Sequence, residues 1–259
     1  KRLAKKQPNW RQYVAAVTVF SAVVYFFFSH DSLYFVSFLA ELIRTFGIGL
    51  LLQKILKEKS VSEISLKTQQ LYVVVFATRL AFKVFYERDF LYAFVELLAL
   101  FLTVVIVYLM RFKFRATYSD TYDTVNEYFL VAICIATSIF LHPSVTPSWT
   151  VNVLWAFSTY LESVTLVPQI WIVHRVKRVE DATAHYIASL FLSRVLELSF
   201  WIIALVARNY LRMWSSLGYY VIATELLHSL LLSDFIFYYV RSYWKGMSLV
   251  LPAMVGTPQ

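Results

Sequence analysis

Eight apolar windows, each about as long as a helix that crosses a bilayer, follow one another along this 259-residue chain. A helix that spans the hydrocarbon core needs about 20 predominantly apolar residues, and the connections between these windows are short and polar. The pattern therefore predicts an all-α multi-pass membrane protein with eight transmembrane helices. The windows are 12–29, 33–53, 69–87, 90–110, 125–141, 149–173, 184–207 and 215–240.

The composition agrees with a membrane protein. Hydrophobic residues make up 59% of the chain and charged residues 15%, and the mean hydropathy is +0.62. An ordinary soluble domain is about 45–50% apolar and about 25% charged. These values exclude a disordered chain, a conventional soluble enzyme and a nucleic-acid-binding domain. The single cysteine, Cys134, cannot build a disulfide framework, and the spacing of His, Cys and Asp residues suggests neither a metal site nor a cofactor.

The cationic residues lie mainly on one side of the predicted membrane. Seventeen of the 24 Lys and Arg residues precede the first window or follow the second, fourth, sixth or eighth. The loops on the opposite side contain only Arg88, Arg208 and Arg212. Since cytoplasmic loops carry an excess of Lys and Arg, both termini are expected in the cytoplasm.

Ten charged residues lie inside the windows and away from their ends. Each costs about 2.5–3.5 kcal/mol at the bilayer centre unless it is paired or solvated, so each is a functional candidate. The alternative is that they pair with one another, or that those near a helix end reach the interface. These residues are Arg44, Arg79, Lys83, Arg194, Glu41, Glu96, Glu162, Glu197, Glu225 and Asp234.

Two of these arginines are expected at the same depth. Arg79 and Arg194 each lie about ten residues from the cytoplasmic start of their helix, which places them about 15 Å deep, near the midplane. Lys83 follows Arg79 by one helical turn, where like charges repel. An anion between these cations would relieve the repulsion, and a carboxylate fits an arginine bidentately. An internal ion pair with Glu162 or Glu197 remains the alternative.

The matched depth also suggests an internal repeat at an offset of 115 residues. The repeat makes helices 2–4 and 6–8 equivalent three-helix units joined by helix 5. Parallel units of this kind place a ligand site at their interface near the midplane. The coinciding pairs are Thr68/Thr183, Phe76/Phe191 and Arg79/Arg194.

Three segments resemble a known family. Residues 161–170, LESVTLVPQI, are very close to the LESVAILPQL signature of the KDEL receptors, the ER lumen protein-retaining receptors. Residues 63–79 resemble their GISxKxQxL…RY signature, and residues 111–118 their KFKATYD stretch. The resemblance covers about 33–253 and leaves the first window outside, as in longer, divergent KDEL-receptor-like proteins.

The resemblance implies a division of the chain into three parts. Residues 1–32 form an N-terminal cytoplasmic segment with an extra transmembrane helix. Residues 33–253 form a seven-helix core related to the PQ-loop and SWEET transporters, with two three-helix bundles. Residues 254–259 form a cytoplasmic tail. The Pro168-Gln169 pair is expected to kink the sixth helix, because proline lacks a backbone donor.

The resemblance further implies a sorting receptor of the early secretory pathway, in ER and Golgi membranes. Such receptors bind the C-terminal K/HDEL tails of escaped ER residents and return them to the ER in coat-protein-I vesicles. The expected partners are the tails of ER lumenal proteins, the coat protein I machinery and the lipid bilayer, with no nucleic acid. Two alternatives stay open: a small-solute transporter of the PQ-loop/SWEET type, and a trafficking scaffold that binds no ligand.

Matching positions carry the family's functional residues onto this chain. The family's two ligand-binding arginines fall on Arg79 and Arg194, its tryptophan on Trp155 and its fifth-helix glutamate on Glu162. Together with the charge analysis, the predicted ligand-binding set is Arg79, Arg194, Trp155, Glu162, Lys83 and Glu197. Asp234 and Lys245 are assigned to trafficking.

The chain also departs from the family pattern. Arg44 occupies the position of a pH-sensing histidine, and Phe82 and Asn152 occupy acidic positions. The depth count places no histidine in the deep part of the predicted cavity. Because arginine keeps its proton at physiological pH, ligand binding is expected to depend less on pH than in the family.

Overall fold

The computed structural model describes residues 32–87, 89–176, 178–207, 215–245 and 249–250. The predicted first helix, 12–29, lies outside these residues. The elements are α2 (Ser32–Glu58), α3 (Leu66–Phe82), η1 (Lys83–Glu87), α4 (Phe90–Tyr108), η2 (Leu109–Lys113), η3 (Arg115–Thr117), α5 (Glu127–Phe140), α6 (Trp149–Val164), α7 (Val167–Val176), β1 (Arg178–Val179), α8 (Asp181–Ala207), α9 (Ser215–Lys245) and β2 (Leu249–Val250).

Within the described ranges the chain is almost entirely helical, as predicted, and a helix occupies each of the seven later windows. The two short strands, β1 and β2, pair antiparallel. Four of the helical segments are long and apolar enough to cross a membrane. They are Tyr34–Glu58, Phe90–Lys113, Asp181–Val206 and Tyr219–Trp244.

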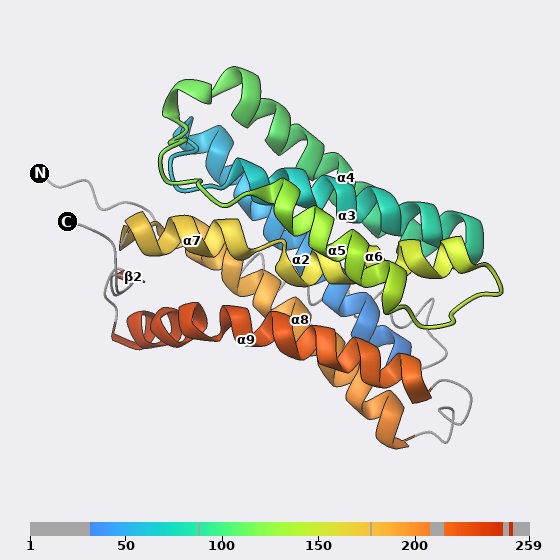
Figure 1. Ribbon diagram of the computed structural model, residues 1–259. Helices are drawn as coiled ribbons and strands as arrows, with labels where there is room; N and C mark the ends of the chain where they lie inside the picture. Colours follow the sequence, from blue (N-terminus) through green and yellow to red (C-terminus); the bar gives the residue numbers. More distant parts are fainter. Residues whose placement is uncertain (1–31, 88, 177, 208–214, 246–248, 251–259) are drawn as a thin grey trace, which may run out of the picture.

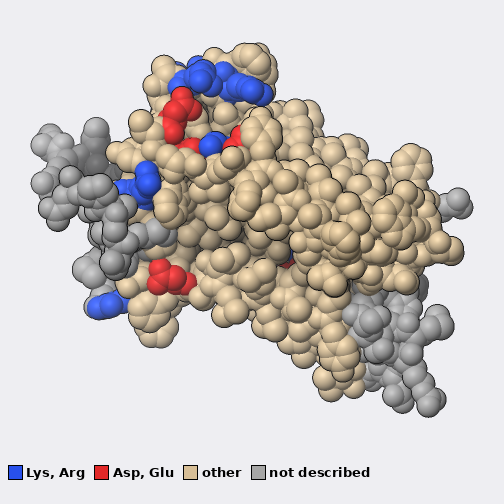
Figure 2. Space-filling view, viewed as in Figure 1, with Lys and Arg blue, Asp and Glu red and all other residues tan. Residues whose placement is uncertain are grey.

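The helices run side by side, and the connections between them gather at two ends (Figure 1). The α2–α3, α4–α5 and α7–α8 connections lie at the left of Figure 1, and the α3–α4 and α5–α6 connections lie at the right. Figure 2 shows the Lys and Arg side chains of this face gathered at the left end, whereas the middle and right are almost free of them. We call the left end the cationic end. Exposed residues there include Lys57, Lys59, Arg111, Lys113 and Arg115.

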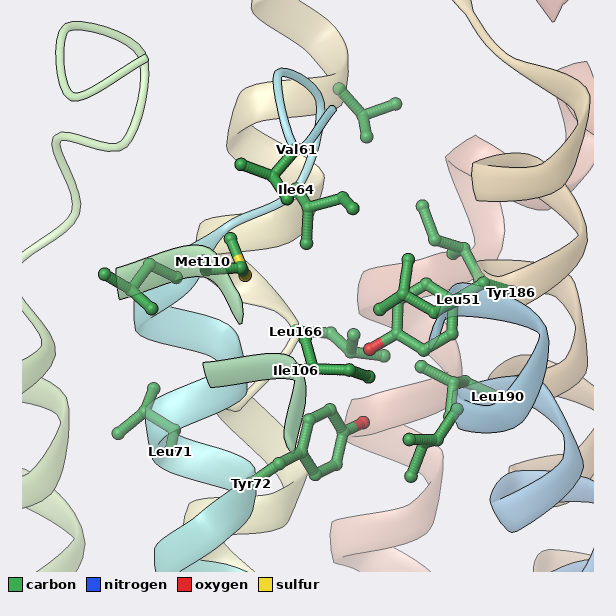
Figure 3. Packing of buried hydrophobic residues seen from close by; sticks show 14 of the residues in the cluster. Leu51, Val61, Ile64, Leu71, Tyr72, Ile106, Met110, Leu166, Tyr186 and Leu190 are labelled. Carbon is green, nitrogen blue, oxygen red and sulfur yellow. The ribbon is translucent and has the colours of Figure 1, made fainter. Parts of the chain in front are cut away.

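The core lies between α2, α3, α4 and α8. Figure 3 shows Leu51, Tyr72, Ile106, Tyr186 and Leu190 directed toward a common interior, and each is at most 1% exposed. Because lipid tails are as apolar as these side chains, close van der Waals packing between the helices stabilises this interior. The helices that carry the charged residues are therefore held together by apolar contacts.

The predicted kink is confirmed as a break between α6 and α7 at residues 165–166, just before Pro168. A threonine of α3 satisfies backbone groups there: Thr68 Oγ1 donates to the Thr165 carbonyl (3.0 Å) and accepts from the Gln169 N–H (3.1 Å). The Gln169 side chain in turn accepts from the Ser65 N–H at 2.9 Å. These bonds tie the start of α3 to the break.

Outside the spans, Asp123 anchors the α4–α5 connection to the start of α3. Its Oδ2 accepts from Ser65 Oγ at 2.9 Å and from Tyr118 Oη at 2.6 Å. Burial, followed by the hydrogen bond to Asp123, raises the pKa of the Tyr118 phenol. The phenol therefore stays a neutral donor to the carboxylate.

Helices α2 and α8 approach closely at Gly47, and this contact gives a stability prediction. A Cβ at Gly47 would lie 1.9 Å from Ser189 Oγ and 3.0 Å from Ser189 Cβ. Gly47→Ala is therefore expected to cost about 1–3 kcal/mol through overpacking, measured as a lower melting temperature. Gly49→Ala is the matched control, because a Cβ at Gly49 meets nothing within 4 Å and alanine favours a helix. Equal effects of the two substitutions would contradict the close approach.

Candidate functional site

Eight charged side chains from the helices form one connected set of ion pairs, which we call the charge network. Seven of them are buried, and the eighth, Arg79, is half-buried. They come from α2, α3, η1, α4, α6, α8 and α9, so the network crosses the whole helical bundle. Its members are Glu41, Arg44, Arg79, Lys83, Glu96, Glu162, Arg194 and Glu225.

Glu162 of α6 lies at the centre of the network. Its Oε1 accepts from Arg44 Nη1 at 2.7 Å and from Arg194 Nη2 at 2.8 Å. Its Oε2 pairs with Arg79. Three guanidinium groups thus share one carboxylate that is 2% exposed.

Further carboxylates complete the network on both sides of Glu162. On one side Glu96 pairs with Arg44 (2.9 Å) and Lys83 (2.8 Å), and Lys83 also pairs with Glu41. On the other side Glu225 pairs with Arg194 at 3.2 Å. Four cations therefore face four carboxylates. Such compensation is needed because an unpaired charge away from water is costly.

The structure thus shows the internal ion pairs that remained an alternative for the two midplane arginines. Their surroundings nevertheless differ. The Arg194 side chain is 5% exposed and bound by two carboxylates, whereas the Arg79 side chain is 21% exposed and pairs, among the described residues, with Glu162 alone. Since a guanidinium carries five donors, Arg79 keeps donors that an incoming anion can reach.

The remaining predicted site residues lie at or beyond the edge of the network. Trp155 is half-buried, and its ring lies 6.1 Å from that of Tyr220 on α9. Glu197 is half-buried and accepts from Ser37 Oγ at 3.0 Å. Asp234 is exposed, with His174 Nε2 3.6 Å away. The Lys245 side chain lies outside the described part of the structure.

Four network members were recognised in the sequence as charges within spans but were not assigned to the site. They are Glu41, Arg44, Glu96 and Glu225, and only the packing of the helices shows that they meet. The depth count was wrong for His228, which is 1% exposed and interacts electrostatically with Arg194 and Glu162. His228 follows Glu225 by three residues, so both lie on one face of α9. This spacing was the sequence feature that could have placed His228 beside the network.

Among the described residues, no group of three or more potential ligands could hold a metal ion.

Membrane-spanning helices around a buried set of ion pairs define a helical membrane protein with a charged centre. Comparison with known proteins identifies the family of this chain. The family described as ER lumen protein retaining receptor matches residues 60–204. The chain belongs to this family, whose members are receptors rather than enzymes.

Individual relatives extend the match over most of the chain. An ER lumen protein-retaining receptor of Drosophila melanogaster is 34% identical over 217 residues, which cover 83% of this chain and 98% of that protein. One of Dictyostelium discoideum is 32% identical over 220 residues, with the same coverage. The human ER lumen protein-retaining receptor 2 is 32% identical over 214 residues, which cover 80% of this chain and 93% of that protein.

Proposed function

We propose that this protein is a sorting receptor of the early secretory pathway that binds K/HDEL-like C-terminal tails of ER lumenal proteins and returns them from Golgi to ER. The observation that carries the proposal is the Arg79 side chain, which is the most exposed cation of the charge network. Its free donors suit a terminal carboxylate, because arginine binds carboxylates in two parallel hydrogen bonds.

Specificity for a chain end follows from the charge of the carboxylate. A peptide amide or an internal peptide bond lacks the negative charge that the Arg79 donors would bind, so a tail is distinguished from the rest of a polypeptide. The half-buried Trp155 ring offers an apolar face to the residues that precede the terminal carboxylate. Glu162 holds the Arg79 guanidinium in place, and Arg194, Lys83 and Glu197 complete the proposed site.

The experiment that tests the function measures binding of peptides that end in HDEL or KDEL, as free acids and as C-terminal amides. A receptor of this kind should bind the free acids and lose the amides. Equal weak binding of both forms would favour a small-solute transporter, and no binding of either would favour a trafficking scaffold.

The membrane topology is part of the proposal. The eight-helix arrangement adds an N-terminal segment (1–32) to a PQ-loop/SWEET-like core (33–253), followed by a cytoplasmic tail (254–259). It is supported by the helix in each later window and by the cationic end. Coat protein I would then meet the chain on the cytoplasmic side, where Asp234 and Lys245 are proposed to serve trafficking.

An even number of spans predicts that both chain ends lie on the cytoplasmic side. Epitope tags placed before Lys1 and after Gln259 should therefore be digested together when protease is added to sealed microsomes. A lumenal marker protein, intact until detergent is added, is the control. Protection of one tag and digestion of the other would mean that the number of spans is odd and that the eight-helix topology is wrong.

The pH dependence of binding is expected to be weak. Arg44 donates to Glu162 and Glu96 in the network, and an arginine keeps its proton between pH 5 and 8. The affinity for a KDEL peptide, whose lysine stays protonated over this range, should therefore change less than tenfold, or about 1.4 kcal/mol, between pH 5.5 and 7.4. A preference for acid greater than tenfold would contradict this, and His228 and Glu225 would be the groups to substitute next.

A further inference from the structure

The end of α4 carries a group of three exposed cations, which we call the α4-end patch. The candidate span Phe90–Lys113 runs through α4 and its continuation η2. Arg111, Lys113 and Arg115 lie at the end of this span, and all three are exposed. Figure 2 shows Lys and Arg side chains crowded at the upper left, where α4 ends in Figure 1. The patch therefore lies where a membrane-spanning helix leaves the bilayer.

The patch carries more positive charge than the neighbouring carboxylates neutralise. Arg115 lies 3.6 Å from Asp120, and both side chains are more than half exposed. Asp120 is the one carboxylate that pairs with the patch within the described part of the chain. Asp123, the other carboxylate of the α4–α5 connection, is buried and accepts hydrogen bonds from two hydroxyl groups. The charges of Arg111 and Lys113 are therefore left for an anion from outside the chain.

The cations at the end of α2 are balanced, in contrast to the patch. Lys54 lies 2.7 to 3.8 Å from three carboxylates. These carboxylates belong to Glu58, Glu63 and Glu180. Together with the exposed Lys57 and Lys59, three cations there face three carboxylates. Both groups lie at the cationic end, so the surplus positive charge belongs to the α4-end patch in particular.

An exposed apolar stripe leads along α4 to the patch. Phe101, Val104 and Tyr108 are exposed and follow one another at spacings of three and four residues, which places them on one face of the helix. The exposed Phe112 continues the stripe, and its ring lies 5.3 Å from that of Tyr108. Aromatic rings at the end of a span lie at the level of the lipid headgroups. Acyl chains can therefore pack along the stripe while headgroups meet the cations.

We propose that the α4-end patch binds the headgroup of an anionic phospholipid, with an acyl chain of that lipid along the stripe. Guanidinium groups bind phosphate through two parallel hydrogen bonds, and a lysine adds a further point charge. By the positive-inside rule the cationic end faces the cytoplasm, where the leaflet contains anionic phospholipids that attract basic clusters beside a span. A lipid fits better than a soluble phosphate, because the cations and the apolar stripe adjoin at one helix end.

The test measures which lipids stay bound to the purified protein in native mass spectra. Phosphatidylserine and phosphatidylcholine with identical acyl chains are added at equal concentrations. The wild-type protein should retain phosphatidylserine at least about tenfold more than phosphatidylcholine. The double variant Arg111→Gln/Lys113→Gln should lose this preference with an unchanged melting temperature, because both side chains are exposed. The matched control, Lys57→Gln/Lys59→Gln, removes two exposed cations from the same end and should keep the preference.

The other outcomes overturn the proposal. Equal retention of the two lipids by the wild-type protein would show that the patch does not select an anionic headgroup. A preference that persists in the Arg111/Lys113 variant, or that the control also loses, would assign the selectivity to another surface or to the whole cationic end. Glycerophosphoserine, which is the headgroup without acyl chains, should displace phosphatidylserine poorly, and displacement as strong as by the lipid itself would overturn the lipid as the occupant. None of these results depends on peptide binding, so the patch and the proposed function are tested separately.

Discussion

Glu162→Gln should destabilise the protein more than any other substitution proposed here. Glu162 is the shared partner of Arg44, Arg79 and Arg194, and removing one partner of a buried ion pair costs about 3–5 kcal/mol, because it strands the remaining charge. Here the surplus positive charge remains inside the bundle, where water is excluded. Thermal unfolding in detergent or nanodiscs should show a large loss of melting temperature or a failure to accumulate folded protein.

A glutamate at the cationic end provides the control for Glu162. Glu58 is 38% exposed and lies 3.8 Å from Lys54, so Glu58→Gln should change stability by about 0–1 kcal/mol, the range of surface ion pairs. Glu162→Asp, which keeps the charge on a shorter side chain, should fall between the two glutamine variants. A Glu162→Gln protein that melts like the wild type would show that the three guanidinium groups do not depend on this carboxylate.

Arg79→Gln should abolish ligand capture while the protein stays folded. The Arg79 side chain is partly exposed and has one carboxylate partner among the described residues, so its removal strands little charge. Hydrogen bonds to charged groups contribute about 1.5–3 kcal/mol each, so losing even one of the two should lower the affinity for an HDEL free acid by at least about 10- to 150-fold. Peptide binding and melting temperature, measured on the same sample, give both readouts.

Arg194→Gln provides the contrast. Arg194 is 5% exposed and bridges Glu162 and Glu225, so its loss should lower the melting temperature as well as binding. From the sequence, the two arginines are expected at equal depth and in equivalent roles, whereas the packing of the helices distinguishes them.

One outcome would contradict the prediction for Arg79. Loss of stability without loss of binding in Arg79→Gln would show that Arg79 serves only to neutralise Glu162.

The sequence by itself determined the local features of this protein. The later apolar windows became helices, and the helix break falls immediately before Pro168, as its missing donor requires. Segments such as 161–170 indicated the receptor family that the comparisons show. These features could be read from the chain because hydropathy and backbone hydrogen bonding depend on residues that are close in sequence.

Only the tertiary structure decided how the membrane-embedded charges are distributed. The sequence identified all eight network charges as charges within spans and named Glu162 as a possible partner of the arginines. It did not show that three guanidinium groups share Glu162. Nor did it show that Arg79 stays partly exposed, or that Glu197 accepts from Trp201 and Ser37 and forms no ion pair within the described part of the chain. Ion pairing depends on which faces of α2, α3, α6, α8 and α9 pack together, and one of these pairs, Arg44–Glu162, joins residues 118 positions apart in the chain.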